Sequence, residues 1–338
     1  MKKLISLICV LAMVLALAAC GSSAPAAATE APAASTEAPA EDVSADKTFV
    51  VGICQLVQHP ALDAATQGFK DALPEALGDK VTFQEQNASG DSATCSLICN
   101  QFVSDEVDLI MANATASIQA AASATNTIPI LGTSITDYGV ALGVDNWTGV
   151  SGTNISGTSD LAPLDGQAAM IQELFPDAKT IGLLYCSGEP NSIFQADSME
   201  ALLTDMGYSV ERYTFADSND VSSVTANACS NSDVLYIPTD NTAASCTEAI
   251  NNVALSAGIP IVAGEEGIAS GCGAATLSIS YYDLGRATGE MAAEILTEGA
   301  DISTMEVRFA PAFTKEYNAD ICEALNITVP EDYVAIAK

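Results

Sequence analysis

The chain has 338 residues, with 43 Asp or Glu against only 11 Lys or Arg, so its formal net charge at pH 7 is −32. So acidic a protein repels the phosphates of nucleic acids and of anionic lipid headgroups, which argues against either as a partner of the folded part. From about Thr48 onward the chain is long enough for two domains of ordinary size.

The N-terminus, MKKLISLICVLAMVLALAAC, has two lysines, then an apolar stretch and small residues, which predicts a signal peptide at residues 1–19. Its end, LAAC, resembles a bacterial lipobox, so we expect Cys20 to carry lipid; the alternative is an ordinary signal with a coincidental cysteine. Residues 20–47 are rich in Ala, Pro, Ser, Thr and acids, which predicts a disordered tether. We therefore expect an exported protein held to the cell membrane through its lipid alone, with its folded part outside the cytoplasm.

Beyond the tether, short apolar runs alternate with segments of helical periodicity. Strands are expected at 49–54, 81–86, 108–113, 128–134, 180–186, 208–215, 233–239 and 259–265. Helices are expected at 92–105, 116–126, 161–175, 191–206, 220–230, 242–257 and 282–297, and one from Pro60 that stops or kinks at Pro74. This order predicts an α/β fold of two doubly wound parallel-sheet lobes.

Segments 108–138 and 233–267 share one order: strand, polar loop, Ala-rich helix and an Ile-Pro-Ile strand. Two like lobes explain this better than chance similarity. The stretches 148–165 and 271–285 show no core pattern and suit crossing segments. We expect residues 48–155 and about 280–305 in lobe 1, and residues 156–279 and about 306–338, including a strand near MEVRFAP, in lobe 2.

Eight cysteines fall in the expected folded part, and they suit either disulfides of an exported protein or small buried side chains. Cys95 and Cys99 have a spacing that could suit a metal, but no CxxC pair or second histidine supports them. We expect no metal site and no cofactor.

Ligands of open parallel sheets bind at the carboxyl ends of the strands. Polar loops follow the expected strands at 55–59, 113–115, 134–138, 187–192, 239–241 and 265–266. The first contains His59, the only histidine, for which helix entry, ligand contact and catalysis remain open. No GxSxG, HExxH, P-loop or GxGxxG motif occurs, and the adjacent Glu265 and Glu266 suit a loop contact better than acid/base chemistry, so we expect no enzyme.

Two of these loops fit the ends of an amino acid. The loop 187–192 opens a helix, whose free N–H groups suit a carboxylate; the alternative is that Asn191 or Ser192 only caps the helix. Asp240 is placed to hold an ammonium group or, alternatively, only to cap the next helix.

Several motifs, among them QHPALDA (58–64), ISGTSDLAPLD (155–165), PTDN (238–241) and YYDLG (281–285), resemble those of ABC-transporter substrate-binding lipoproteins of the tryptophan/tyrosine type. The resemblance spans about Phe49 to Tyr333 and implies the type 1 periplasmic-binding fold. It also implies a monomer that binds an amino-acid-like solute, expected to be aromatic, and delivers it to a permease with a separate ATPase. The ligand-binding residues that it implies are Gln55, His59, Ala114, Thr115, Ser134, Tyr138, Ser187, Asn191, Ser192, Asp240 and Glu266.

Some alternatives stay open beside this resemblance. Trp147, the only tryptophan, is expected to pack or to lie at the surface rather than stack on a ligand. A sensor that presents its bound solute to a membrane receptor would share the fold, and an extracellular hydrolase is the less favoured third reading.

Overall fold

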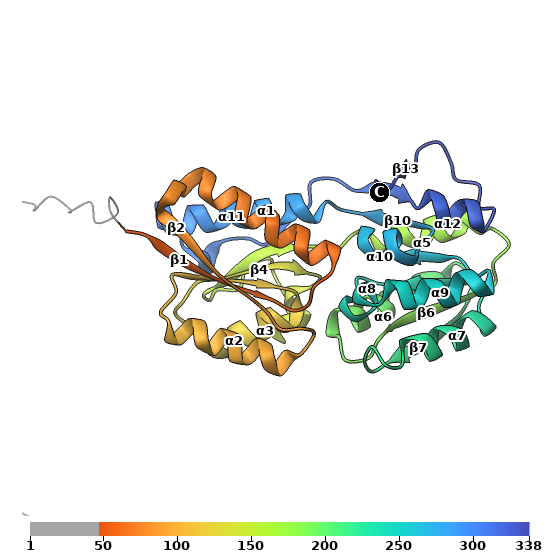
Figure 1. Cartoon of the computed structure of the whole chain (residues 1–338), viewed down its shortest axis with the longest axis horizontal. Helices are drawn as coiled ribbons and strands as arrows, with labels where there is room; N and C mark the ends of the chain where they lie inside the picture. The colour runs from red at the N-terminus through yellow and green to blue at the C-terminus, as the bar shows by residue number, and fades with distance from the viewer. Residues whose placement is uncertain (1–46, 338) are drawn as a thin grey trace, which may run out of the picture. The chain divides into compact units, whose positions relative to one another are not determined.

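Two β-sheets organise residues 47–337, the part of the chain that this computed structural model describes (Figure 1). These residues belong to one compact unit. The signal peptide expected at 1–19, the lipid expected on Cys20 and all but the last residue of the tether expected at 20–47 lie outside the described residues.

The first sheet has six parallel strands. In spatial order they are β11 (Arg308–Phe309), β5 (Ile155–Ser159), β4 (Ile130–Ile135), β3 (Leu109–Asn113), β1 (Phe49–Gln55) and β2 (Val81–Asn87). Its helices are α1 (Pro60–Leu77), α2 (Ser92–Ser104), α3 (Thr115–Ala124), α4 (Tyr138–Leu142) and α11 (Tyr281–Glu298), with short 3₁₀ turns η1 (Gly78–Lys80) and η2 (Ile302–Thr304). We call this sheet and its helices lobe 1.

The second sheet has seven strands, parallel except for the pairing of β10 with β12. In spatial order they are β13 (Val334–Ala335), β12 (Thr314–Tyr317), β10 (Ala275–Ser278), β9 (Ile261–Ala263), β8 (Val234–Ile237), β6 (Thr180–Cys186) and β7 (Ser209–Phe215). Its helices are α5 (Leu164–Leu174), α6 (Pro190–Asp205), α7 (Val221–Asn231), α8 (Asn241–Ser245), α9 (Thr247–Ala257), α10 (Glu266–Cys272) and α12 (Ala319–Ala324). We call this sheet and its helices lobe 2.

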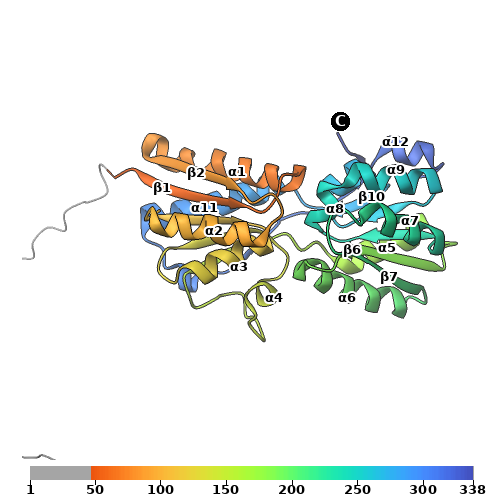
Figure 2. The same ribbon diagram turned by 60° about the horizontal axis from the view of Figure 1, so that its bottom comes forward.

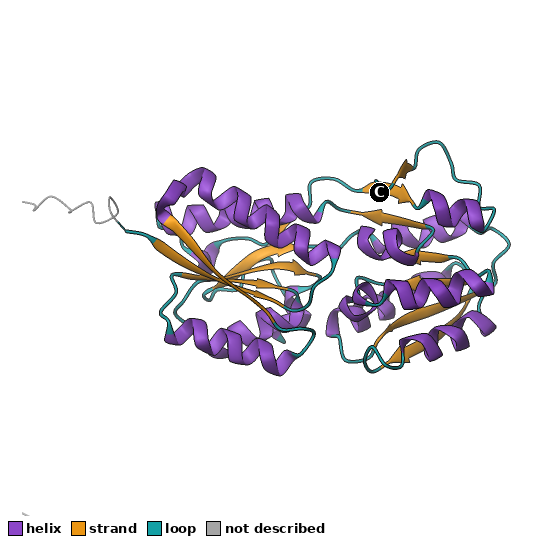
Figure 3. Cartoon of the chain, viewed as in Figure 1, coloured by secondary structure: helices purple, strands orange, loops and turns teal. Residues whose placement is uncertain are grey.

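Helices cover both faces of each sheet, because the central strands are apolar on both sides. In lobe 1, α1 and α11 lie on one face and α2 and α3 on the other, as Figures 1 and 2 both show. In lobe 2, α7, α9 and α10 pack on one face and α5 and α6 on the other, and the alternation of strand and helix is clear in Figure 3. The predicted α/β fold of two lobes is confirmed, with a single antiparallel pair in the second sheet.

Helix α11 joins lobe 1 by packing closely along α1. A Cβ atom added at Gly285 would come 1.9 Å from the backbone oxygen of Ala65, and one at Gly68 would come 2.0 Å from that of Tyr282. Glycine at both positions therefore lets the two backbones touch. This contact ties a late segment of the chain to its first helix.

The prediction that 148–165 has no core pattern is wrong, because all five residues of β5 are buried. Apart from Ile155, its buried residues are small, and several carry hydroxyl groups, such as Thr158, which bonds Thr133 and Thr288. Strand β11 pairs with β5, so the strand expected near MEVRFAP belongs to the first sheet and not to lobe 2. The first sheet thus includes residues beyond the expected limits of 155 and 305.

One helix prediction also needs correction, and of the two outcomes expected at Pro74 the stop does not occur. The helix expected at 242–257 is two helices, because α8 ends at Ser245 and α9 begins at Thr247. Helix α1 continues past Pro74 to Leu77, where the N–H of Gly78 bonds the Pro74 carbonyl. Pro74 lies in the last turn, so its missing N–H removes only one helical bond there.

Candidate functional site: a polar cavity between the strand ends of both lobes

A small cavity lies where strand ends of the two lobes meet. Its volume is about 10 Å³, close to the roughly 10–15 Å³ that a cavity needs to hold a single water molecule. It is lined by His59, Leu62, Ser134, Thr136, Asp160 and Tyr281 from lobe 1 or its crossing segments, and by Asn191, Thr239, Asp240, Asn241, Ala244 and Glu265 from lobe 2. The polar residues among them lie at or just beyond the carboxyl ends of strands, where open α/β sheets bind ligands.

His59 precedes α1 with extended backbone and a side chain that caps nothing. Its Nε2 lies 3.3 Å from Oδ1 of Asn241 in the other lobe. That amide is oriented by its own Nδ2, which donates to Oε2 of Glu189 at 2.7 Å. Because an amide oxygen only accepts, Nε2 of His59 carries the proton. Burial lowers the pKa of His59, which favours the neutral ring and leaves Nδ1 as a bare acceptor.

Glu189 holds Asn241 in place through the start of α8. Its carboxylate accepts the backbone N–H groups of Asn241 and Thr242, both at 2.9 Å, and the Thr242 hydroxyl at 2.7 Å. A carboxylate at a helix N-terminus is stabilised by the free N–H groups and the helix dipole. The orientation of His59 therefore rests on a cap in the opposite lobe.

Asp160 follows β5 and is buried, with 5% of its surface exposed. Its Oδ2 accepts the hydroxyl of Tyr281 at 2.9 Å, whereas Oδ1 has no hydrogen-bond partner among residues 47–337. Burial raises the pKa of Asp160 to about 6. An unpaired buried carboxylate oxygen is costly, so this atom is a strong candidate for ligand contact.

Ser134, the next-to-last residue of β4, has a left-handed backbone conformation, with φ of 56°. Its buried hydroxyl has no partner within the described residues. A residue other than glycine in this region carries strain of about 1–3 kcal/mol, and such strain clusters at functional sites. Ala114, at the end of the neighbouring strand β3, has φ of 88°.

The buried acids of lobe 2 differ from Asp160 because backbone N–H groups occupy both of their oxygens. Asp240 accepts from Ala243 N at 2.8 Å and from Cys186 N at 2.6 Å. Glu265 accepts from Gly267 N at 2.6 Å and from Ile268 N at 2.5 Å. Burial raises the pKa of Asp240 to about 8, with Glu189 adding to the rise, and that of Glu265 to about 7. Both side chains therefore serve as helix caps.

Three hydrogen-bonding side chains link the lobes beside the cavity. The hydroxyls of Thr136 in lobe 1 and Thr239 in lobe 2 are 3.3 Å apart. Gln195 of α6 donates to both, at 3.4 Å to Thr136 and in a shorter bond to Thr239. Closure of the cleft therefore brings polar groups together without leaving these three unpaired.

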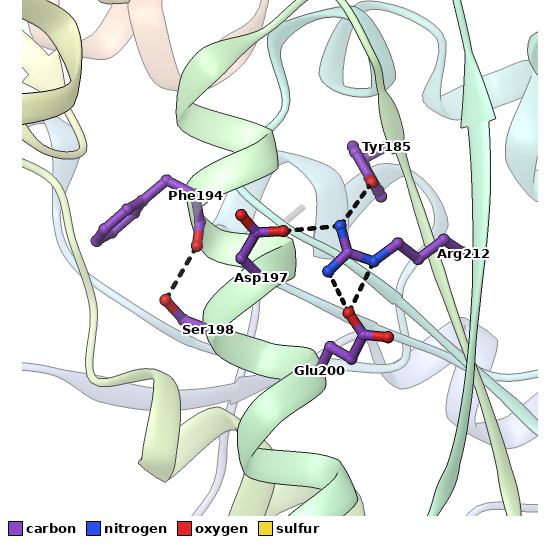
Figure 4. A network of polar contacts seen from close by, with 6 residues as sticks. All are labelled: Tyr185, Phe194, Asp197, Ser198, Glu200 and Arg212. Carbon is purple, nitrogen blue, oxygen red and sulfur yellow. Dashed lines mark hydrogen bonds and ion pairs between the residues drawn. The ribbon is translucent and has the colours of Figure 1, made fainter. Parts of the chain in front are cut away.

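Helix α6, which carries Asn191 and Gln195, is fastened to β7 by one arginine (Figure 4). Arg212 donates to Asp197 at 2.7 Å and to Tyr185 at 3.3 Å, and its Nε and Nη2 both donate to Oε2 of Glu200. These contacts lie at the surface, away from the residues that line the cavity.

Of the residues predicted to bind ligand, His59, Ser134, Asn191 and Asp240 line the cavity. The other seven do not: Gln55, Ala114, Thr115, Tyr138, Ser187, Ser192 and Glu266. The side chain of Gln55 is occupied by Asp63, Thr66 and the Val57 carbonyl.

Tyr138 is a core residue whose hydroxyl donates to the carbonyls of Gly132 and Thr158, each at 3.1 Å. Its ring stacks on Trp147 with centroids 5.7 Å apart, as the packing interpretation of Trp147 expects. Ser187 is exposed and bonds the Phe215 carbonyl, and Ser192 is fully buried. Glu266 lines a separate cleft.

Sequence reasoning missed Asp160 and Tyr281 as site residues. Both lie in motifs that carry the family resemblance, ISGTSDLAPLD and YYDLG. The available signal was position, because each follows a strand, β5 or β10, that the hydrophobic pattern did not reveal. Thr136, Thr239, Asn241 and Glu265 lie in loops that were expected to face the crevice.

Two larger clefts adjoin the cavity. One of about 380 Å³ shares Asn241 with it and is lined on its apolar side by Leu56, Val57 and Ala116. Another of about 320 Å³ shares Glu265 and Tyr281 with it.

Three observations on the described residues bear on other kinds of site. Residues 47–337 contain no group of three or more His, Cys, Asp or Glu arranged to hold a metal ion. All eight cysteines of this part are free thiols, and all but Cys246 are buried. Within the same residues, no helix has the length and apolar character needed to cross a membrane.

Two sheets with a polar cavity at their strand ends define a two-lobed binding protein. Residues 50–338 match the family model of ABC transporter substrate binding proteins. A tyrosine-binding protein of Clostridioides difficile (strain R20291) is 38% identical over 280 residues, 82% of this chain and 81% of that protein. The chain therefore belongs to the ABC transporter substrate-binding protein family, whose members act outside the cytoplasm.

Solved structures agree with this assignment. An ABC domain from Streptococcus pneumonia in complex with L-Trp has a TM-score of 0.80 and 32% identity, over 84% of this chain and 97% of that one. A substrate-binding protein with adhesive properties from Clostridium difficile, in its ligand-free, open form, has a TM-score of 0.66 and 37% identity, over 86% of this chain and all of that one. The resemblance seen in the sequence is confirmed.

Proposed function

We propose that this protein captures an aromatic amino acid, tyrosine or tryptophan, between its two lobes. The observation that carries the proposal is the cavity at the strand ends, which polar groups of both lobes enclose. The ligands named for two relatives, tyrosine and tryptophan, support the aromatic class. His59, Ser134, Asn191, Asp160 and Thr136 are the proposed polar contacts, and the adjoining clefts offer room for a ring.

Capture works by hinge closure in this proposal. The chain passes between the lobes three times, between β5 and α5, between β10 and α11, and between β11 and β12. Short crossing segments of this kind absorb the backbone rotation of domain closure. Hydrogen bonds such as His59 to Asn241 form only when the lobes meet, so the closed form encloses the ligand with polar groups from both sides.

Binding by the full-length chain tests the proposal. Isothermal titration with the common amino acids should give saturable binding for tyrosine or tryptophan. At a hundredfold excess over its Kd the ligand should also add about 2.7 kcal/mol to the free energy of unfolding. Absence of binding by tyrosine, tryptophan and phenylalanine would overturn the aromatic assignment.

The cellular setting is a further part of the proposal. The protein would be exported, anchored as a monomer by lipid on Cys20, and would deliver its solute to an ABC permease driven by a separate ATPase. The lipobox-like sequence LAAC supports the anchor. Replacement of Cys20 with Ala should abolish labelling by radioactive palmitate and release the protein from membranes; unchanged labelling would refute the lipid site. Loss of radiolabelled tyrosine or tryptophan uptake in cells that lack this gene, restored by its return, would test delivery.

A further inference from the structure

Three polar atoms in the cavity have no hydrogen-bond partner within residues 47–337. They are Nδ1 of His59, Oγ of Ser134 and Oδ1 of Asp160. The three residues are 7%, 6% and 5% exposed, so solvent reaches them poorly. Buried polar groups are nearly always paired, and each unpaired one requires an explanation. Three around a cavity of about 10 Å³ point to a group that binds there.

All three atoms can accept a hydrogen bond. An ionised Asp160 only accepts, and the bond from His59 Nε2 to Asn241 makes Nδ1 an acceptor in the neutral ring. The Ser134 hydroxyl accepts through its lone pairs and keeps one proton to donate. The matching group is therefore small, carries several N–H bonds and has positive charge.

The other buried acids at the cavity do not compete for this role. Asp240 and Glu265 already accept two backbone N–H groups each. Asp160 alone among these three carboxylates has an oxygen without a partner inside the described chain. The ammonium contact expected at Asp240 thus fits Asp160 better.

We propose that the cavity is the seat of a primary ammonium group, which donates one N–H to each of Asp160 Oδ1, His59 Nδ1 and Ser134 Oγ. This rests on the proposed function of the cleft and specifies the ligand as a primary amine. A cavity of the size of one water molecule fits an –NH₃⁺ group and leaves little room for an N-methyl group. The remainder of the ligand extends into the adjoining clefts.

The location of Asp160 connects this seat to the hinge. Asp160 lies in the first crossing segment, between β5 and α5, and its partner Tyr281 begins α11 directly after the second crossing. An ammonium group on Asp160 therefore neutralises a buried charge at the point where two crossing segments meet. All three acceptors come from lobe 1 or its edge, so this lobe recognises the amine before lobe 2 closes.

A series of ligands that differ only at the amine tests the seat in the full-length chain, purified in detergent. L-tyrosine is compared with N-methyl-L-tyrosine, tyramine and 3-(4-hydroxyphenyl)propionate by isothermal titration. Loss of the amine should weaken binding by about 100-fold and N-methylation by about 10-fold, in line with one charge-assisted bond and one steric clash. Tyramine should bind more tightly than the propionate. Affinities within threefold for tyrosine and the propionate would overturn the proposal.

Substitutions test whether Asp160 binds the ammonium group. Asp160→Asn preserves shape and removes the charge, so the preference for tyrosine over the propionate should fall by about 100-fold. Because this change removes an unpaired buried carboxylate, the melting temperature should not fall. Asp233→Asn is the matched control, because its carboxylate accepts the backbone N–H groups of Lys179 and Thr180 away from the cavity; it should leave that preference intact. An unchanged preference in Asp160→Asn would refute the assignment.

The outcomes separate this proposal from the proposed function. If tyrosine binds and Asp160→Asn retains the amine preference, the aromatic assignment stands and the seat is wrong. If no aromatic amino acid binds, the aromatic assignment fails, and the remaining amino acids become the probes. Any that binds should then lose about 100-fold in Asp160→Asn, and a protein that binds none of them would overturn the seat as well.

Discussion

The two sides of the cavity use buried carboxylates in opposite ways. On the lobe 2 side, Asp240 and Glu265 each accept two backbone N–H groups and start a helix. On the lobe 1 side, Asp160 has one bond from Tyr281 and one oxygen without a partner in the described chain. All three are almost fully buried, so burial alone does not distinguish them.

The distinction follows from what comes next in the chain. Helices α8 and α10 begin at the residue directly after Asp240 and Glu265, so N–H groups of the first turn reach each carboxylate. After Asp160, helix α5 begins only at Leu164, with Pro163 as its N-cap, so no helical N–H is near. A buried acid at a strand end is therefore a candidate ligand contact when the following helix starts late.

The largest expected effect comes from removing a helix-capping carboxylate on the lobe 2 side. Asp240→Ala removes the acceptor of two buried N–H groups and should lower the free energy of unfolding by about 4 kcal/mol. Urea unfolding of the variant beside the wild type measures this. Asp160→Ala should have a far smaller effect on stability, so an equal loss in both variants would contradict the comparison.

The pH dependence of stability sharpens the comparison. Burial raises the pKa of Asp160 to about 6 from its usual 3.8. Between these two pKa values the folded state holds a proton that the unfolded state has released, so the free energy of unfolding falls as pH rises. The contribution of Asp160 to stability is present below about pH 4 and lost as pH rises to about 6. The loss amounts to about 3 kcal/mol.

Asp160→Asn lacks this titration, whereas Glu265 and Asp240 remain in both proteins. The difference in free energy of unfolding between variant and wild type should therefore grow between pH 4 and 7, with the variant the more stable above pH 6. Denaturation curves recorded across this range measure the gap, and parallel pH profiles would show that Asp160 does not titrate in this way.

A smaller effect is expected at the contact between the lobes. Thr136→Val keeps the shape of the side chain but removes the hydroxyl that faces Thr239 and Gln195. The closed form should lose about 1 kcal/mol, which weakens ligand affinity by about fivefold. Titration calorimetry gives the affinity, and Ser123→Ala, at an exposed site on α3, is a control that should bind normally.

The smallest effect is expected away from the cavity. Arg212→Met removes the surface contacts between β7 and α6 and should cost about 1 kcal/mol of stability, less at high salt. Ligand affinity should stay within twofold, because the buried Asn191 and Gln195 are also held by Thr239. A tenfold loss of affinity would show that this surface cluster positions the site.

Much of the fold was predictable because six of its strands contain apolar runs, while the edge strands β2 and β7 mix apolar and polar residues over a similar length. Strand β5 was not, since apart from Ile155 its buried residues are Ser, Gly and Thr, and the Ser156 and Ser159 hydroxyls donate to backbone carbonyls. Gly157 adds to this, because a Cβ there would come 2.0 Å from the Gly132 oxygen. Hydrophobic patterns do not report a core that is built from small polar residues.

The candidate site was predictable only in part, for the same reason. His59, Ser134, Asn191 and Asp240 follow strands with clear apolar patterns, and all four line the cavity. Asp160 and Tyr281 follow the two strands that the pattern missed. Whether an acid caps a helix or faces a ligand depends on the donors near its oxygens, which only the three-dimensional structure shows.

The stacking of Trp147 on Tyr138 gives the protein an optical reporter. Trp147 is the only tryptophan of the chain, so its emission comes from a single known place. Its neighbour Tyr138 bonds the carbonyls of Gly132 in β4, the strand that contains Ser134, and of Thr158 in β5, the strand that leads to Asp160. A shift of these strands when tyrosine binds would change the fluorescence of an indole that does not line the cavity.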